Sequence, residues 1–201
     1  MPPTADHEAR RRQVATALLS VIANHGLEAA SIARVAEAAG ASTGLVQRYF
    51  RSKDELLLFA FDHLVEQTLA RLVAAEHVGS IRIRLFRGLR TMLPLDEERI
   101  TEARVTQAFA TRALHSPRLR RVIDASAQMV RKQCAATLRR AQELGEAPAH
   151  LDADFEATML VAFTDGLTST IVADPAAISP GEADRMLLRY LDRVFEVAAP
   201  H

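Results

Sequence analysis

The sequence is poor in the residues from which disulfides, metal sites and nucleophilic centres are usually built. Its one cysteine, Cys134, excludes an intrachain disulfide and any zinc site made from several cysteines. The seven histidines are scattered, and none pairs with another at the four-residue spacing of a helical zinc site. The chain also has no phosphate-cradling glycine loop and no nucleophile elbow. We therefore expect no enzyme, no cofactor and no metal.

Long apolar runs are also missing. No run approaches the ~20 residues that a membrane-spanning helix needs. Residues 1–12 are polar and charged, and no apolar signal core follows them. Together with the single cysteine, these absences predict a cytoplasmic protein with no membrane partner.

A net charge is missing as well, because 25 basic residues balance 25 acidic ones. Neutrality by itself gives no support for a nucleic-acid partner. The distribution is more informative: residues 1–53 carry seven basic and four acidic groups, and the remainder carries 18 and 21. A mildly positive head on a mildly negative body suits DNA binding, because local charge sets the affinity for phosphates.

Apolar residues recur at helical spacing throughout the chain, and the alternation typical of strands does not occur. Glycine, proline and serine punctuation divides the chain into about nine helices. The fold class is therefore predicted to be all-α. The expected helices cover residues 7–24, 31–39, 43–49, 52–75, 79–93, 97–114, 118–144, 152–173 and 182–198.

The most informative segment runs from Leu27 to Leu56. Two short helices meet there at Gly40, and a tight turn between helices needs a residue free to take positive φ. Val35 and Ala36 belong to the apolar stripe of the first of these helices. This pattern is typical of a helix-turn-helix.

The residues left on the outer face of this segment suit contact with DNA. Ser42 begins the second short helix, where free backbone N–H groups attract phosphate. Gln47 and Arg48 offer groups that hydrogen-bond to base edges. Lys53 opposes the dipole of the next helix, which an anion bound there would explain; the alternative is a solvated lysine beside two acidic residues. We expect phosphate binding.

This segment resembles the DNA-binding head of the TetR family of bacterial regulators. The matching residues occur at the family's spacing without a gap: Ser31-Ile32, Val35-Ala36, Ala39-Gly40-Ala41-Ser42, Gly44, Tyr49-Phe50, Ser52-Lys53 and Glu55-Leu56. The resemblance is specific over residues 8–65 and weaker beyond, where Asp165-Gly166-Leu167 is similar to many members. The chain departs from the family at Gln47, often aromatic there, and at Ala41, often a bulkier aliphatic residue. No operator sequence is therefore carried over.

The resemblance implies a recognition helix from Thr43 to Tyr49. It places two groups of residues on the DNA. Those near phosphates or the groove edge are Ser31, Ala33, Ser42, Tyr49 and Lys53. Those near bases are Thr43, Gly44, Leu45, Gln47 and Arg48.

The last two long helices are the most apolar part of the chain. Apolar side chains between Phe155 and Val172 point in nearly every direction, which predicts a helix buried on all sides. Two such helices from each of two subunits would form a four-helix interface, as the resemblance also implies. The alternative is the core of a monomer. The expected dimer interface consists of Phe155, Leu167, Ile171, Met186, Leu187, Leu191, Val194 and Phe195.

Soft and aromatic side chains in the same body are candidates for an effector pocket. The candidate residues are Phe86, Met92, Phe109, Met129, Gln133, Met159 and Phe163. Each of them also fits a simple core position. Cys134 follows Arg131 and Lys132, so a reactive thiol and a buried small hydrophobe are both open.

We therefore expect a helix-turn-helix DNA-binding domain at residues 1–55 and a helical ligand-binding and dimerisation domain at residues 56–201. The expected function is transcription regulation. In the form that the resemblance implies, a homodimeric repressor binds an inverted-repeat operator in double-stranded DNA, and an unidentified small-molecule effector releases it. The alternatives are an all-helical enzyme and an interaction module that reuses the helix-turn-helix without a ligand.

Overall fold

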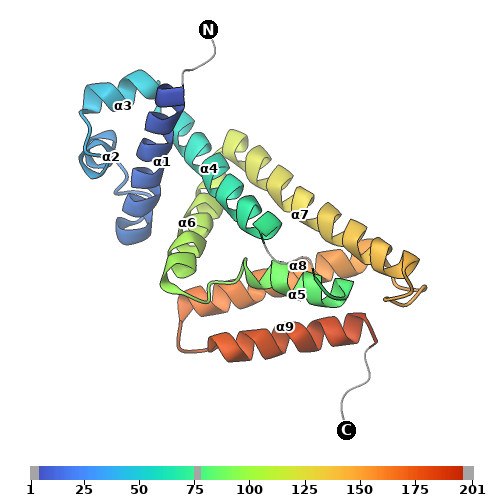
Figure 1. Cartoon of the computed structure of the whole chain (residues 1–201). Helices are drawn as coiled ribbons and strands as arrows, with labels where there is room; N and C mark the ends of the chain where they lie inside the picture. The colour runs from blue at the N-terminus through green and yellow to red at the C-terminus, as the bar shows by residue number, and fades with distance from the viewer. Residues whose placement is uncertain (1–4, 75–77, 197–201) are drawn as a thin grey trace. The chain divides into compact units, whose positions relative to one another are not determined.

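The computed structural model describes residues 5–74 and 78–196, and over these residues the chain forms nine helices and no strand (Figure 1). The helices are α1 (Ala5–His25), α2 (Ile32–Ala38), α3 (Thr43–Tyr49), α4 (Lys53–Ala74), α5 (Ile81–Arg90), α6 (Glu97–Ala113), α7 (Pro117–Glu143), α8 (Ala153–Ala173) and α9 (Pro180–Val194). The all-α prediction is confirmed. The predicted helix ends at residue 75 and at residues 197–198 lie outside the described residues.

Serine side chains begin several of the helices. The hydroxyl oxygens of Ser31, Ser42 and Ser80 each accept a hydrogen bond from the backbone N–H three residues later. At α9, Ser179 and Glu182 form a reciprocal capping box, and Pro180 occupies the first turn. These bonds satisfy N–H groups that have no partner inside the helix. They are encoded locally, which is why sequence punctuation located the helix starts well.

The first compact unit consists of residues 1–69 and 101–123. Its core is formed by α1 to α3, the first part of α4, α6 and the start of α7. Its fully buried large side chains include Leu18, Val46, Phe50, Leu56 and Phe109. Phe61 on α4 meets Phe109 on α6 edge to face, with ring centroids 5.4 Å apart.

The second compact unit consists of residues 70–100 and 124–201. Leu187 and Leu191 of α9 and Leu160 of α8 are completely buried in its core. Helix α9 contacts both α5 and α8. Ion pairs at the surface of this unit connect α5 to α9. In one of them, Nε of Arg90 lies 2.6 Å from Oδ1 of Asp184.

The two units differ from the predicted division at residue 55. The first unit contains the whole predicted helix-turn-helix domain, and it also takes in most of α4 and a later segment of the chain. These units reflect packing, whereas the predicted division is one of function. The functional boundary between residues 55 and 56 stays a prediction.

Candidate nucleic-acid interface

Helices α2 and α3 form a helix-turn-helix whose turn depends on Gly40. Gly40 has a φ of 62°, which is the left-handed conformation that the sequence required of it. The N–H of Ala41 donates to the carbonyl of Ala36, so the chain turns directly after α2. Val35 and Val46, one on each helix, are completely buried. The buried faces of both helices are thereby fixed, and the opposite faces are left to solvent.

The ten residues predicted to contact DNA lie on this outer side of the first unit. Eight of them are exposed, and Leu45 and Tyr49 are partly buried. A Cβ added at Gly44 would meet no atom within 4 Å, so the surface of α3 is open at this position. The fold thus brings together in three dimensions the group that the sequence singled out. Contact with DNA stays a prediction for each of the ten residues.

Tyr49, at the end of α3, is held between two neighbours. His7 of α1 meets the tyrosine ring edge to face, with centroids 4.9 Å apart. The guanidinium of Arg48 lies over the same ring at 5.4 Å from its centroid. Aromatic and cation–π contacts of this kind restrict the ring's orientation. The phenol is therefore held in a defined direction at the edge of the predicted interface.

Lys53 is exposed at the first residue of α4. The preceding Ser52 accepts a hydrogen bond from the N–H of Glu55, as expected of a capping box. The Glu55 carboxylate accepts from the N–H of Arg51 at 2.9 Å, one residue earlier than the motif prescribes. Three residues separate Lys53 from Tyr49, the last residue of α3.

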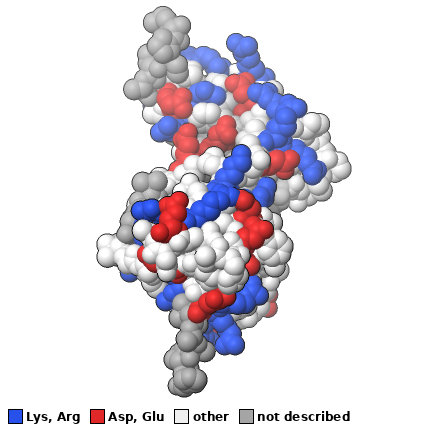
Figure 2. Space-filling view, turned by 90° about the vertical axis from the view of Figure 1, so that its right-hand side faces the viewer, with Lys and Arg blue, Asp and Glu red and all other residues white. Residues whose placement is uncertain are grey.

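Basic groups do not form an unbroken face on the side of the molecule drawn in Figure 2, where acidic side chains are interspersed among them. The helix-turn-helix segment and the start of α4 supply exposed positive charge of their own. It comes from Arg34, Arg48, Arg51 and Lys53, all of which are exposed. Local charge of this kind suffices for phosphate contacts because the interaction is short in range.

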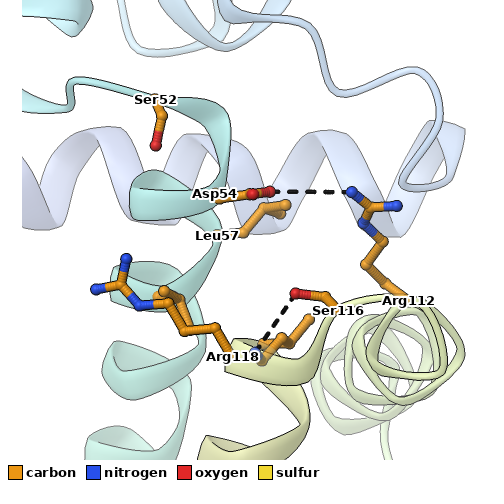
Figure 3. A pocket seen from close by; sticks show the side chains of 8 residues that line it. Ser52, Asp54, Leu57, Arg112, Ser116 and Arg118 are labelled. Carbon is orange, nitrogen blue, oxygen red and sulfur yellow. Dashed lines mark hydrogen bonds and ion pairs between the residues drawn. The ribbon is translucent and has the colours of Figure 1, made fainter.

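A hollow of about 150 Å³ lies in the first unit between the start of α4, the end of α6 and the start of α7 (Figure 3). Arg112 pairs there with Asp54 at 3.9 Å. The hydroxyl of Ser116 accepts from the N–H of Leu119. These polar groups are already engaged with one another, so the hollow is explained by the contacts that join the three helices. None of its lining residues belongs to the predicted effector pocket.

The predicted dimer residues fall into two groups. Phe155 on α8 and Met186 on α9 are exposed, at 58% and 40% of their surfaces. The other six are buried within the core of a single chain: Leu167, Ile171, Leu187, Leu191, Val194 and Phe195. Of the predicted set, Phe155 and Met186 therefore have the most surface available to a second chain, and the interface itself stays a prediction.

Within the single chain, α8 is not buried on all sides, because it has an exposed face; whether a second subunit covers this face stays a prediction. Along this face the exposed residues include Phe155, Met159, Ala162 and Gly166, which recur at helical spacing. Sequence reasoning missed Ala162 and Gly166, although their spacing from Phe155 was a readable signal. Apolar residues all round a helix indicate burial, but one face of such a helix can be left for a second molecule to cover.

The predicted effector residues are divided between the two units, and a pocket formed by them stays a prediction. Phe109 is completely buried in the first unit, whereas the other six belong to the second. Met129, Gln133 and Met159 are exposed, and Phe86, Met92 and Phe163 are partly buried. Phe163 stacks on Tyr190 of α9, with centroids 4.7 Å apart. The guanidinium of Arg193 lies over the same tyrosine ring, so this ring already has both an aromatic and a cationic neighbour.

Cys134 is buried on α7, and burial raises the pKa of its thiol to about 11. The thiol is therefore protonated at neutral pH, and only the thiolate is a strong nucleophile. Of the two alternatives that the sequence left open, the structure supports the buried small hydrophobe.

No three or more side chains of the metal-ligating types come together among the described residues. None of the helices in the described part of the chain combines the length and hydropathy of a membrane span.

Two family models match the chain. Residues 15–59 match the model described as bacterial regulatory proteins, tetR family. Residues 82–196, more than half of the chain, match the model described as BetI-type transcriptional repressor, C-terminal. The first match covers the helix-turn-helix, and the second covers the helices from α5 to α9.

Individual relatives agree with these models over nearly the whole chain. The HTH-type transcriptional regulator PksA of Bacillus subtilis is 31% identical over 196 residues, which are 96% of this chain and 94% of that protein. A transcriptional regulator from Rhodococcus sp. Rha1 has a similar structure, with a TM-score of 0.84, 35% identity, and coverage of 94% of this chain and 99% of that one.

A transcriptional regulator from Saccharomonospora viridis, solved in complex with choline, also has a TM-score of 0.84. It is 25% identical, and the match covers 92% of this chain and 96% of that one. The helix-turn-helix, the all-helical fold of the described residues and these relatives all indicate the same family. The chain belongs to the TetR family of bacterial regulatory proteins, with a BetI-type C-terminal region, and is a DNA-binding transcription regulator rather than an enzyme.

Proposed function

We propose that the protein is a repressor that reads an inverted-repeat operator through α3. The observation that carries the proposal is the exposure of Thr43, Gly44, Gln47 and Arg48 along one helix whose other face is buried. The hydroxyl of Thr43, the amide of Gln47 and the guanidinium of Arg48 suit base edges in the major groove. Lys53 and Ser42 flank them where phosphates run.

We propose a homodimer as the reading unit. The supporting observation is the exposed face of α8, where Phe155 and Met159 are 58% and 41% exposed and are followed by Ala162 and Gly166. Met186 on α9 adds a further exposed apolar side chain. Small residues allow two helices to approach closely, and the larger ones supply the buried area. A twofold dimer then presents two α3 helices to the two halves of a palindrome.

We propose that a small molecule binds the second unit and releases the operator. The Saccharomonospora regulator was solved in complex with choline, which supports a small-molecule ligand for a protein of this fold. Phe86, Met92 and Phe163 are partly buried in this unit and are the best-placed of the predicted lining residues. Helix α4 continues from the first unit into the second, so it is a direct covalent route between effector and DNA. Release requires that the effector bind the DNA-free state more tightly than the DNA-bound state.

The operator proposal is tested by selecting bound sequences from a random duplex library and then measuring affinity over a range of salt concentrations. We expect an enriched inverted repeat and a steep fall of affinity with salt, because phosphate contacts release counterions. Enrichment of a single, unrepeated site would contradict the dimeric reading. Absence of enrichment would contradict sequence-specific recognition.

The dimer proposal is tested with Met159→Asp, which places a charge on the exposed face of α8. We expect sedimentation equilibrium to show a dimer for the parent protein and a monomer for the variant, because an unpaired charge is costly to bury. Gln67→Asp, at an exposed position of α4 outside this face, is the control for a new charge on the surface of the subunit. If the Met159→Asp variant is still a dimer, the exposed face of α8 is not the dimer interface.

The effector proposal is tested with choline, because a relative binds it. A rise in melting temperature together with loss of operator binding would identify a cationic effector. The neutral carbon isostere of choline is the control, since it has the same shape without the charge. Equal responses to both compounds would show that the site reads shape rather than charge.

A further inference from the structure

The guanidinium of Arg11 occupies an unusual place in the first unit. It extends from α1 and lies over the rings of Phe50 and Phe59, at 4.9 Å and 4.2 Å from their centroids. The two rings also contact each other, with centroids 5.4 Å apart. Phe50 is the residue that ends α3, and Phe59 lies on α4. One cation therefore contacts the end of the recognition helix and the next helix at once.

The same guanidinium faces the start of α4. Its Nη2 atom lies 3.9 Å from Oε1 of Glu55, and Oε2 of Glu55 accepts a hydrogen bond from the N–H of Arg51. Arg51 is one of the three residues that join α3 to α4. The contacts of Arg11 thus extend through Glu55 to the connection that separates Tyr49 from Lys53, the two residues predicted to bind phosphate at this end of the interface.

The two rings and Glu55 stabilise the cation of Arg11, but the position also carries a cost. The side chain of Arg11 is only 22% exposed, and its Nε atom is buried without a hydrogen-bond partner among the described residues. An unsatisfied buried N–H group destabilises the fold, and a methionine of similar length would pack on the two rings without that loss. A charge retained in such surroundings calls for a role beyond packing.

We propose that Arg11 is a positioning residue for DNA binding, which holds the junction of α3 and α4 so that Tyr49 and Lys53 meet the phosphate backbone together. Arg11 does not itself contact DNA. The inference rests on the proposed interface, because it assigns Arg11 a role only through residues of that interface.

The test uses the full-length protein and a duplex that carries the selected inverted repeat. Arg11→Met keeps the contact with the phenylalanine rings and removes the charge. We expect its affinity to fall roughly threefold to thirtyfold, which lies within the range of couplings between residues in one network. Arg11→Lys retains a cation at the rings and is expected to recover part of the loss. Arg12→Met is the matched control, because Arg12 pairs at the surface with Glu8 and Glu66 and not with the junction.

A double-mutant cycle with Lys53→Ala separates positioning from other roles. If Arg11 acts through the junction, Arg11→Met has much less effect once Lys53 is absent, so the two losses are not additive. Additive losses, with an equal fall in salt dependence for each variant, would show that Arg11 contacts phosphate itself and would overturn the proposal. An unchanged affinity of Arg11→Met would overturn it as well.

Folding and the interface are checked separately. Urea unfolding of each variant gives the folded fraction, and an affinity loss that disappears after this correction would reduce Arg11 to a structural residue. Glu55→Gln is a second test of the same connection, because it weakens the ion pair with Arg11 and leaves the two rings unchanged. It should also lower the affinity for the operator. If Lys53→Ala itself has no effect, the proposed interface fails; if Lys53→Ala weakens binding and Arg11→Met does not, only the positioning role fails.

Discussion

The side-chain amide of Gln13 on α1 donates a hydrogen bond to the main-chain carbonyl of Ala39, with an N–O distance of 3.1 Å. Ala39 is the residue that ends α2, where carbonyl groups lose their partners within the helix. The bond connects α1 to the turn that orients α3, across 26 positions of the sequence. It was not predicted, because nothing in the local pattern around Gln13 indicates its partner.

Replacement of Gln13 by alanine is expected to lower the free energy of unfolding by about 0.5–1.5 kcal/mol, the usual contribution of one such hydrogen bond. Urea unfolding followed by circular dichroism measures the change. Gln67→Ala, at an exposed position of α4, is the control. Equal destabilisation by both substitutions would contradict a specific role for the Gln13 amide.

Lys53→Ala should weaken binding to all duplexes by a similar factor and lower the slope of log affinity against log salt by about one. The reason is that a phosphate contact carries no sequence information. Lys132, the only other lysine of the chain, is exposed on α7, and Lys132→Ala should leave both quantities unchanged. Titrations at several salt concentrations measure them. A similar change in slope for both lysines would point to a general effect of charge.

Gln47→Ala should change which sequences are preferred, by roughly 1–3 kcal/mol at the contacted base pair. The exposed side chain of Gln47 is attached to a helix whose buried residue, Val46, is fully enclosed, so the amide is presented from a rigid element. Repeating the random-duplex selection with the variant measures the change. An unaltered preferred sequence would show that the register assigned to the recognition helix is wrong.

Adjacent residues of α9 should respond differently to truncation. Leu187 is completely buried, so Leu187→Ala is expected to lower the free energy of unfolding by about 2–5 kcal/mol through lost burial and a cavity. Met186 is 40% exposed, so Met186→Ala should destabilise the subunit far less and act mainly on dimer dissociation. Urea unfolding and sedimentation equilibrium separate the two effects. A large loss of subunit stability from Met186→Ala would contradict the assignment.

Cys134 should react slowly with alkylating reagents in the folded protein. A pKa of about 11, instead of the ordinary 9.0, lowers the thiolate fraction at pH 8 about a hundredfold. Because the shift comes from burial, unfolding in urea should restore the normal rate. Iodoacetamide labelling followed by mass spectrometry measures both rates. Comparable rates in the folded and unfolded protein would contradict the buried, protonated thiol.

Local patterns were sufficient for the helices and for the turn. Helical periodicity and serine caps are properties of neighbouring residues, so the predicted helix limits lie close to the observed ones. Gly40 was assigned a positive φ because no other common residue takes that conformation readily, and the structure confirms it. The family resemblance could also be recognised locally, because its matching residues lie close together in the sequence.

The sequence by itself thus determined the all-α fold class, the helix-turn-helix and its outward-facing residues. Only the tertiary structure decided which apolar residues of α8 and α9 lie inside the subunit, placing Leu187 in the core and leaving the neighbouring Met186 at the surface. It also decided that Arg11 meets Phe50 and Phe59. The physical reason is that burial and side-chain partners depend on segments distant in sequence, whereas periodicity and capping are set within a few residues.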